Sequence, residues 1–154
     1  MKMQQAPDDF FATELMMAGD VSFEERRASL IEAAHGHLGH HRQLCHELHK
    51  AGGSGREVVA CIAEMADQLV RNLYHCASAE FPTSGKVCSA VIALGGYGRA
   101  ELNPLSDIDI MFCYPRSDDS DGGRCISNDP LFTRLARAVI SDLSEITEDG
   151  FCFR

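Results

Sequence analysis

Hydrophobic positions in the first half of the chain recur every three or four residues, as on one face of a helix. Ser22, with Glu25 three residues later, predicts a capping box that begins a helix over Phe23–Lys50. After a Gly-rich link, the same period predicts a second helix over Arg56–Ser78. Because the link is short, we expect a long antiparallel helical hairpin within residues 1–80.

The second half of the chain has short apolar runs separated by Gly and polar residues. Val87–Leu94 stops at a Gly-Gly pair and predicts a buried strand, and Asp107–Tyr114 predicts a second strand. Residues 95–106 between them are expected to form a loop or a short helical turn. Residues 116–124 predict a polar loop that resembles a calcium loop only in composition, without its Gly spacing or its closing Glu.

A third amphipathic helix is predicted over Pro130–Leu143, and Gly150 begins what we expect to be a further strand. The fold class is therefore α+β. It consists of the N-terminal helical hairpin followed by a partial mixed-sheet core over residues 86–154.

Charge and cysteine content narrow the class of protein. The 154 residues include 14 Lys and Arg against 23 Asp and Glu, a net charge of −9, which argues against binding of nucleic acid through its phosphates. No apolar run is long enough to span a membrane. The seven cysteines are an odd number and mostly lie in apolar stretches, so we expect buried free thiols in the cytoplasm.

A Gly-rich segment and two acidic residues carry the candidate chemistry. Gly95, Gly96 and Gly98 follow the first strand, where backbone N–H groups can turn toward a phosphate without interference from a Cβ atom. Asp107 and Asp109 lie two apart on the second predicted strand, so both carboxylates project from one face and can share Mg²⁺. This combination indicates metal-assisted phosphoryl or nucleotidyl transfer.

Neighbouring residues of this segment have structural interpretations. Arg99 and Glu101 can form an ion pair that holds the loop, or Arg99 can contact a nucleotide directly. Tyr97 is expected to pack beside the loop. Ile108 and Ile110 are expected to point into the core, on the face opposite to the aspartates.

The pattern Gly-Gly-Tyr-Gly-Arg-x-Glu-Leu-x-Pro-x-Ser-Asp-Ile-Asp over residues 95–109 resembles the polymerase-beta-type nucleotidyltransferases. Within them it is most similar to the protein-PII uridylyltransferases and the glutamine synthetase adenylyltransferases. The tail, residues 148–154, resembles the adenylyltransferase branch, and the likeness covers Val87–Arg154.

The resemblance implies roles for particular residues. Gly95 and Gly96 would contact the nucleotide phosphates with help from Ser106 or Arg99. The catalytic residues would be Asp107 and Asp109, which would hold Mg²⁺ or Mn²⁺. The implied reaction moves UMP or AMP from a nucleoside triphosphate to a hydroxyl, expected to be a tyrosine of the nitrogen-regulatory protein PII or of glutamine synthetase.

The resemblance also implies a third metal-binding carboxylate just past the position of Arg154, where this chain stops. We therefore expect a core that is incomplete at its C-terminus, and spacing argues against Asp149 as a substitute. The alternative function is a catalytically incomplete module that binds nucleotide or docks to a protein.

His37, His41, Cys45 and His49 recur every four residues, a spacing that can place zinc ligands on one helical face. A zinc-sensing helical protein is therefore a further hypothesis. His41 also falls on the apolar stripe between Leu38 and Cys45, so a core histidine is the simpler interpretation. The density of histidines predicts that their titration loosens the hairpin.

Overall fold

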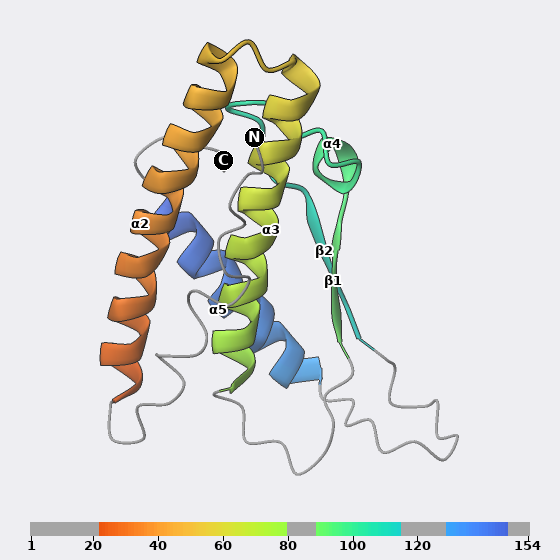
Figure 1. Ribbon diagram of the computed structural model, residues 1–154. Coiled ribbons are helices and arrows are strands. Elements are labelled where there is room, and N and C mark those ends of the chain that lie inside the picture. Colours follow the sequence, from red (N-terminus) through yellow and green to blue (C-terminus); the bar gives the residue numbers. More distant parts are fainter. Residues whose placement is uncertain (1–21, 80–88, 115–128, 148–154) are drawn as a thin grey trace.

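The computed structural model describes residues 22–79, 89–114 and 129–147. Its elements, in chain order, are α2 (Phe23–Lys50), α3 (Gly55–Ala79), β1 (Ala90–Ala93), α4 (Gly95–Gly98), β2 (Ile110–Cys113) and α5 (Asp129–Ile146) (Figure 1). The predicted α+β class is confirmed. The polar loop at 116–124, Asp149 and the strand predicted from Gly150 lie outside the described residues.

Capping boxes begin both long helices. The Ser22 Oγ accepts a hydrogen bond from the Glu25 N–H (3.3 Å), and the Glu25 carboxylate accepts one from the Ser22 N–H (3.0 Å), as predicted. These bonds to Ser22 lower the pKa of Glu25. Ser54 and Glu57 make the same exchange at the start of α3. This second box was missed although its Ser-x-x-Glu spacing is visible in the sequence.

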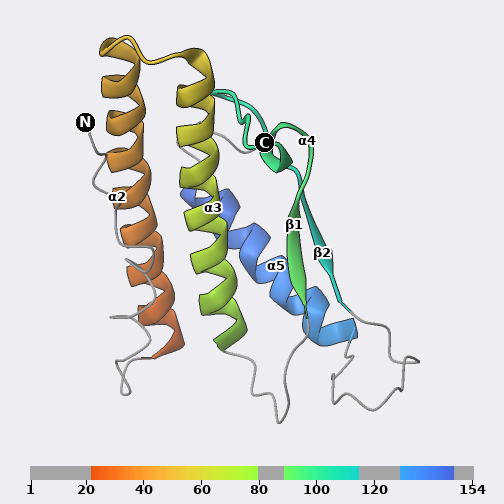
Figure 2. The same cartoon turned by 45° about the vertical axis from the view of Figure 1, so that its right-hand side comes forward.

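Helix α3 is the centre of the fold. It runs antiparallel to α2 and also packs against α5, which crosses both helices (Figures 1 and 2). One cluster of buried side chains draws on α2, α3, α5 and the segment after β1. Its largest fully buried members are Met65, Leu69, Leu73, Leu102, Val139 and Ile146. The division of the chain into two domains stays a prediction.

The two strands form an antiparallel pair in which Ala93 lies opposite Ile110. Ile110, Ala93 and Val91 are half-buried against the core, whereas Ile92 (41% exposed) and Met111 (44% exposed) face outward. The prediction of a buried first strand is therefore wrong for its outer face. A continuous apolar run cannot indicate which face of a strand is covered.

No helix of the described residues is long and apolar enough to cross a membrane. The structure describes four of the seven cysteines, and Cys45 and Cys61 are buried, as predicted, with their Sγ atoms 2.7 Å apart across the hairpin. Cys76 and Cys113 are half-buried.

His41 is a core histidine, as the simpler interpretation predicted. It is 5% exposed, its ring centroid lies 4.2 Å from that of buried His37, and neither of its ring nitrogens has a hydrogen-bond partner among the described residues. Burial is the main reason that the pKa of His41 falls to about 4, with smaller effects from His37 and His40. Among the residues described, no three His, Cys, Asp or Glu side chains are placed to hold a metal ion.

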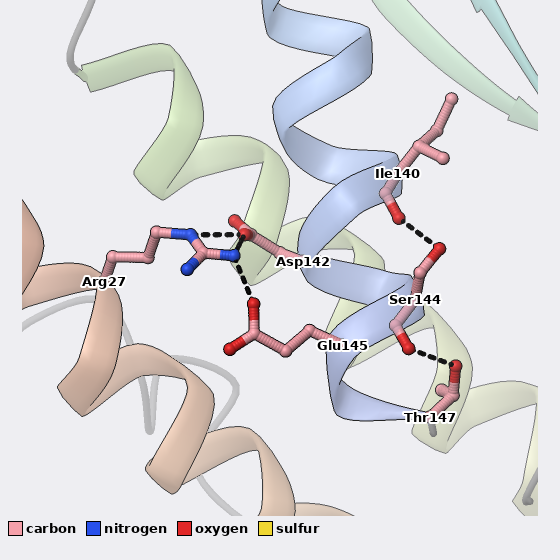
Figure 3. A network of polar contacts seen from close by, with 6 residues as sticks. All are labelled: Arg27, Ile140, Asp142, Ser144, Glu145 and Thr147. Carbon is pink, nitrogen blue, oxygen red and sulfur yellow. Dashed lines mark hydrogen bonds and ion pairs between the residues drawn. The ribbon is translucent and has the colours of Figure 1, made fainter.

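An ionic network joins α2 to α5 (Figure 3). The Arg27 Nε donates to Asp142 Oδ1 (2.8 Å), and a terminal nitrogen of the same guanidinium bonds Glu145. Asp142 is buried, and this burial raises its pKa while Arg27 acts in the opposite direction. Arg27 and Asp142 lie 115 residues apart in the sequence, so no local pattern could indicate this contact.

Arg27→Ala is expected to lower the free energy of unfolding by about 2 kcal/mol at about pH 7, because the buried Asp142 carboxylate loses its cation. Loss of Arg27 should raise the pKa of Asp142 further. A carboxyl with a raised pKa is tolerated best when protonated, so the deficit should shrink as the pH falls toward about 4. Urea unfolding of the unmodified protein and of Arg27→Ala at both pH values measures this difference in the free energy of unfolding.

The exposed neighbour Arg26 offers the matched control, since Arg26→Ala leaves the network intact and should change stability little. A double-mutant cycle with Asp142→Asn should recover most of the Arg27→Ala deficit. An equal deficit at both pH values would contradict the role given to Asp142.

The lowered pKa of His41 predicts that the free energy of unfolding decreases as the pH is lowered. The unfolded chain binds a proton near pH 6.5 and the folded chain only near 4, so the folded state loses about 2 kcal/mol between about pH 7.5 and about pH 5. His41→Met should reduce this loss, whereas His46→Met on the exposed side of α2 should not. Urea midpoints that do not change with pH in the unmodified protein would contradict it.

Candidate functional site

A cleft of about 860 Å³ contains most of the residues singled out from the sequence. Gly96, Arg99, Ser106, Asp107 and Asp109 all line it. The remaining predicted residue, Gly95, is not among the residues that line the cleft, but it lies beside the Asp109 carboxylate. The structure therefore brings the Gly-rich segment and the acidic pair to one place.

Two glycines determine the path of the Gly-rich loop, residues 95–106, whose first four residues form the short helix α4. Gly95 has a φ of +55°, and a Cβ atom placed on it would lie 3.0 Å from Asp109 Oδ2. A Cβ on Gly98 would lie 2.5 Å from the Ala93 carbonyl oxygen, closer than real Cβ atoms approach. The loop can therefore pass close to β1 and to the Asp109 carboxylate only because both positions lack a side chain.

Tyr97 attaches the loop to α3. Its side chain is 6% exposed, and its hydroxyl donates a hydrogen bond to Asp67 Oδ1 (2.7 Å). Burial first, and then the bond to Asp67, raise the pKa of Tyr97, so the hydroxyl stays protonated as a donor. The prediction that Tyr97 packs beside the loop is confirmed.

The acidic pair precedes the strand instead of lying on it. The prediction of a strand from Asp107 is wrong in its start, because β2 begins at Ile110. Pairing nevertheless continues one step further, since the Asp109 carbonyl accepts a hydrogen bond from the Leu94 N–H (2.8 Å). The alternation also holds: both aspartates are exposed, whereas Ile108 and Ile110 are half-buried against the core, as predicted.

Arg99 and Glu101 form the predicted ion pair, with 3.1 Å between Arg99 Nε and Glu101 Oε2. Both side chains are largely exposed and both line the cleft, so the pair contributes little to stability and Arg99 can still turn toward a ligand. Ser106 is half-buried in the same wall, and its N–H donates to the Asn103 carbonyl (3.1 Å).

The donor set of the acidic pair suits Mg²⁺ that arrives with a phosphate ligand. Mg²⁺ is commonly held by one or two carboxylates, with waters and phosphate oxygens as its other ligands. Asp107 and Asp109 supply the two carboxylates. No third His, Cys, Asp or Glu joins them within the described residues, so the pair by itself is not a closed metal site.

Sequence reasoning missed the contribution of α3 to this cleft. Gly55, Arg56 and Val59 line it although they precede the Gly-rich loop by about forty residues. Arg56 follows directly on the Gly-rich link, and no spacing rule relates that position to the acidic pair. Asp67, the partner of Tyr97, was missed for the same reason.

Comparison with known proteins is consistent with this site. The family model "Glutamate-ammonia ligase adenylyltransferase" matches residues 55–154, which include every residue of the cleft. No solved structure matches the chain.

Curated relatives carry the name bifunctional glutamine synthetase adenylyltransferase/adenylyl-removing enzyme. The protein of Chromobacterium violaceum is 36% identical over 122 residues, which are 73% of this chain and 14% of that protein. Those of Nitrosococcus oceani (48% over 73 residues) and Ralstonia nicotianae (45% over 74 residues) match 46% and 47% of this chain, and 8% of each relative. This chain thus spans at most about a seventh of their length. Because the family model covers well over half of this chain, the chain belongs to the glutamate-ammonia ligase adenylyltransferase family.

Proposed function

We propose that the cleft binds ATP together with Mg²⁺ or Mn²⁺ and transfers AMP to a tyrosine hydroxyl of glutamine synthetase. The single observation that carries the proposal is the position of the Asp109 carboxylate against Gly95, so that acidic pair and Gly-rich loop face one cleft. Membership of the adenylyltransferase family supports the reaction type.

Each part of the cleft has a task in this reaction. Backbone N–H groups of the loop would bind phosphate oxygens, as loop amides do in many phosphate sites. Asp107 and Asp109 would hold the metal ion, which when bound neutralises charge on the phosphates. The acceptor oxygen forms a bond to the α-phosphorus while the bond to pyrophosphate breaks, so alignment of ligand and acceptor is the main requirement.

The family favours ATP and glutamine synthetase over UTP and PII. The sequence motif alone left both nucleotides and both acceptors open, whereas the matching model and the relatives are named for adenylyl transfer to glutamine synthetase. We place the reaction in the cytoplasm, in line with the odd number of cysteines in the sequence and their position in apolar stretches.

Two other functions give different results in the same assays. The relatives' name also includes removal of the adenylyl group, so the cleft could act on adenylylated glutamine synthetase. Alternatively, the chain binds nucleotide or docks to a protein without turnover, which the two-carboxylate set of the described residues would favour. Release of pyrophosphate from ATP indicates transfer, release of AMP-derived product from adenylylated glutamine synthetase indicates removal, and binding alone indicates the module.

The double substitution Asp107→Asn with Asp109→Asn should abolish metal-dependent ATP binding, because it removes both candidate metal ligands while keeping side-chain size. Isothermal titration with ATP, in the presence and absence of MgCl₂, measures the change. Glu64→Gln, an acidic residue exposed on α3 outside the cleft, is the charge-matched control. Unchanged binding in the double variant would refute the assignment of the site.

Gly95→Ala should weaken ATP binding by about tenfold, because its Cβ would sit 3.0 Å from Asp109 Oδ2 and its φ of +55° is unfavourable for Ala. Gly39→Ala is the control, since a Cβ there meets nothing within 4 Å and Ala favours the helix α2. Titration of each variant with Mg²⁺ and ATP tests the loop. Equal affinities for both variants would show that the loop does not face the ligand.

A further inference from the structure

The first turn of α3 forms one wall of the cleft. In both views the segment that follows α4 lies beside the start of α3 (Figures 1 and 2). Gly55, Arg56 and Val59 line the cleft together with Asp107 and Asp109. The helical hairpin is thus part of the candidate site.

Arg56 differs from the other arginine of the cleft. The Arg99 guanidinium is paired with Glu101 at 3.1 Å, whereas that of Arg56 is exposed and has neither a hydrogen bond nor an ion pair within the described residues. Its donors are therefore available to a ligand in the cleft.

The charge of the cleft shows what kind of ligand group Arg56 can serve. The charged side chains of the lining are Arg56, Arg99, Glu101, Asp107 and Asp109, so acidic groups outnumber basic ones. The polyphosphate chain and the two carboxylates are all negative, and one Mg²⁺ ion balances only two of these charges, so a further cation is needed in the cleft. A guanidinium presents a planar fork of donors that matches phosphate oxygens, so Arg56 suits the part of the chain away from that pair.

We propose that Arg56 is a ligand of the terminal phosphates of the nucleotide, contributed by α3 to a site whose other parts follow β1. This inference rests on the proposed function, since it requires ATP in the cleft. It assigns the hairpin a direct part in substrate binding.

Arg56→Gln should weaken ATP binding by about tenfold or more in isothermal titration with MgCl₂, because a charge-assisted hydrogen bond is lost. Binding of AMP, which lacks the terminal phosphates, should change by less than about twofold. Arg56→Lys should fall between, since Lys keeps the charge and loses the fork. Arg137→Gln, an equal loss of charge on the exposed side of α5, should bind both nucleotides normally.

The outcomes separate this inference from the proposed function. ATP affinity that is normal in Arg56→Gln but lost in the Asp107 and Asp109 double variant would overturn the role of Arg56 alone. Equal weakening of ATP and AMP would also overturn it, because contact with terminal phosphates cannot affect AMP. Absence of ATP binding in the unmodified chain would overturn both proposals. Circular dichroism of Arg56→Gln, expected unchanged at this exposed position, checks its fold.

Discussion

The hydrogen bond from Tyr97 to Asp67 joins the Gly-rich loop to α3, and the arrangement of the cleft depends on it. The Tyr97 ring is buried in the core cluster and anchors the loop there, and the bond from its hydroxyl to Asp67 fixes the orientation of the ring. The same helix carries Arg56 at its first turn. Tyr97 therefore fixes the position of the Gly-rich segment relative to α3. The cleft lies between the start of α3 and the segment around Asp107 and Asp109.

The loop itself is constrained on its other side by atoms that leave no space for side chains. The backbone at Gly98 approaches the Ala93 carbonyl, and Gly95 approaches the Asp109 carboxylate. The hydrogen bond from Leu94 to Asp109 then continues the strand pairing into the site. Loop and acidic pair are consequently one unit, so a change in either should alter the other.

Periodic patterns predicted the helices well because each helix buries one continuous stripe. Ala34, Leu38 and Cys45 are buried on α2 as expected, and the helix has its predicted bounds. The strands were predicted less well. Their outer face, with Ile92 and Met111, is exposed, and an apolar run cannot report which face has a covering layer. The motif nevertheless identified five residues of the cleft, because glycine and carboxylate requirements are local.

The sequence by itself determined the helices, the class of the fold and the motif over residues 95–109, since capping, periodicity and motif spacing act over short distances along the chain. Only the tertiary structure decided that Arg56 lines the same cleft as the acidic pair, that Asp67 holds Tyr97 and that Arg27 joins Asp142. These contacts connect residues that are about 30 to more than 100 positions apart. Their partners are selected by how the helices pack around α3, which no local pattern encodes.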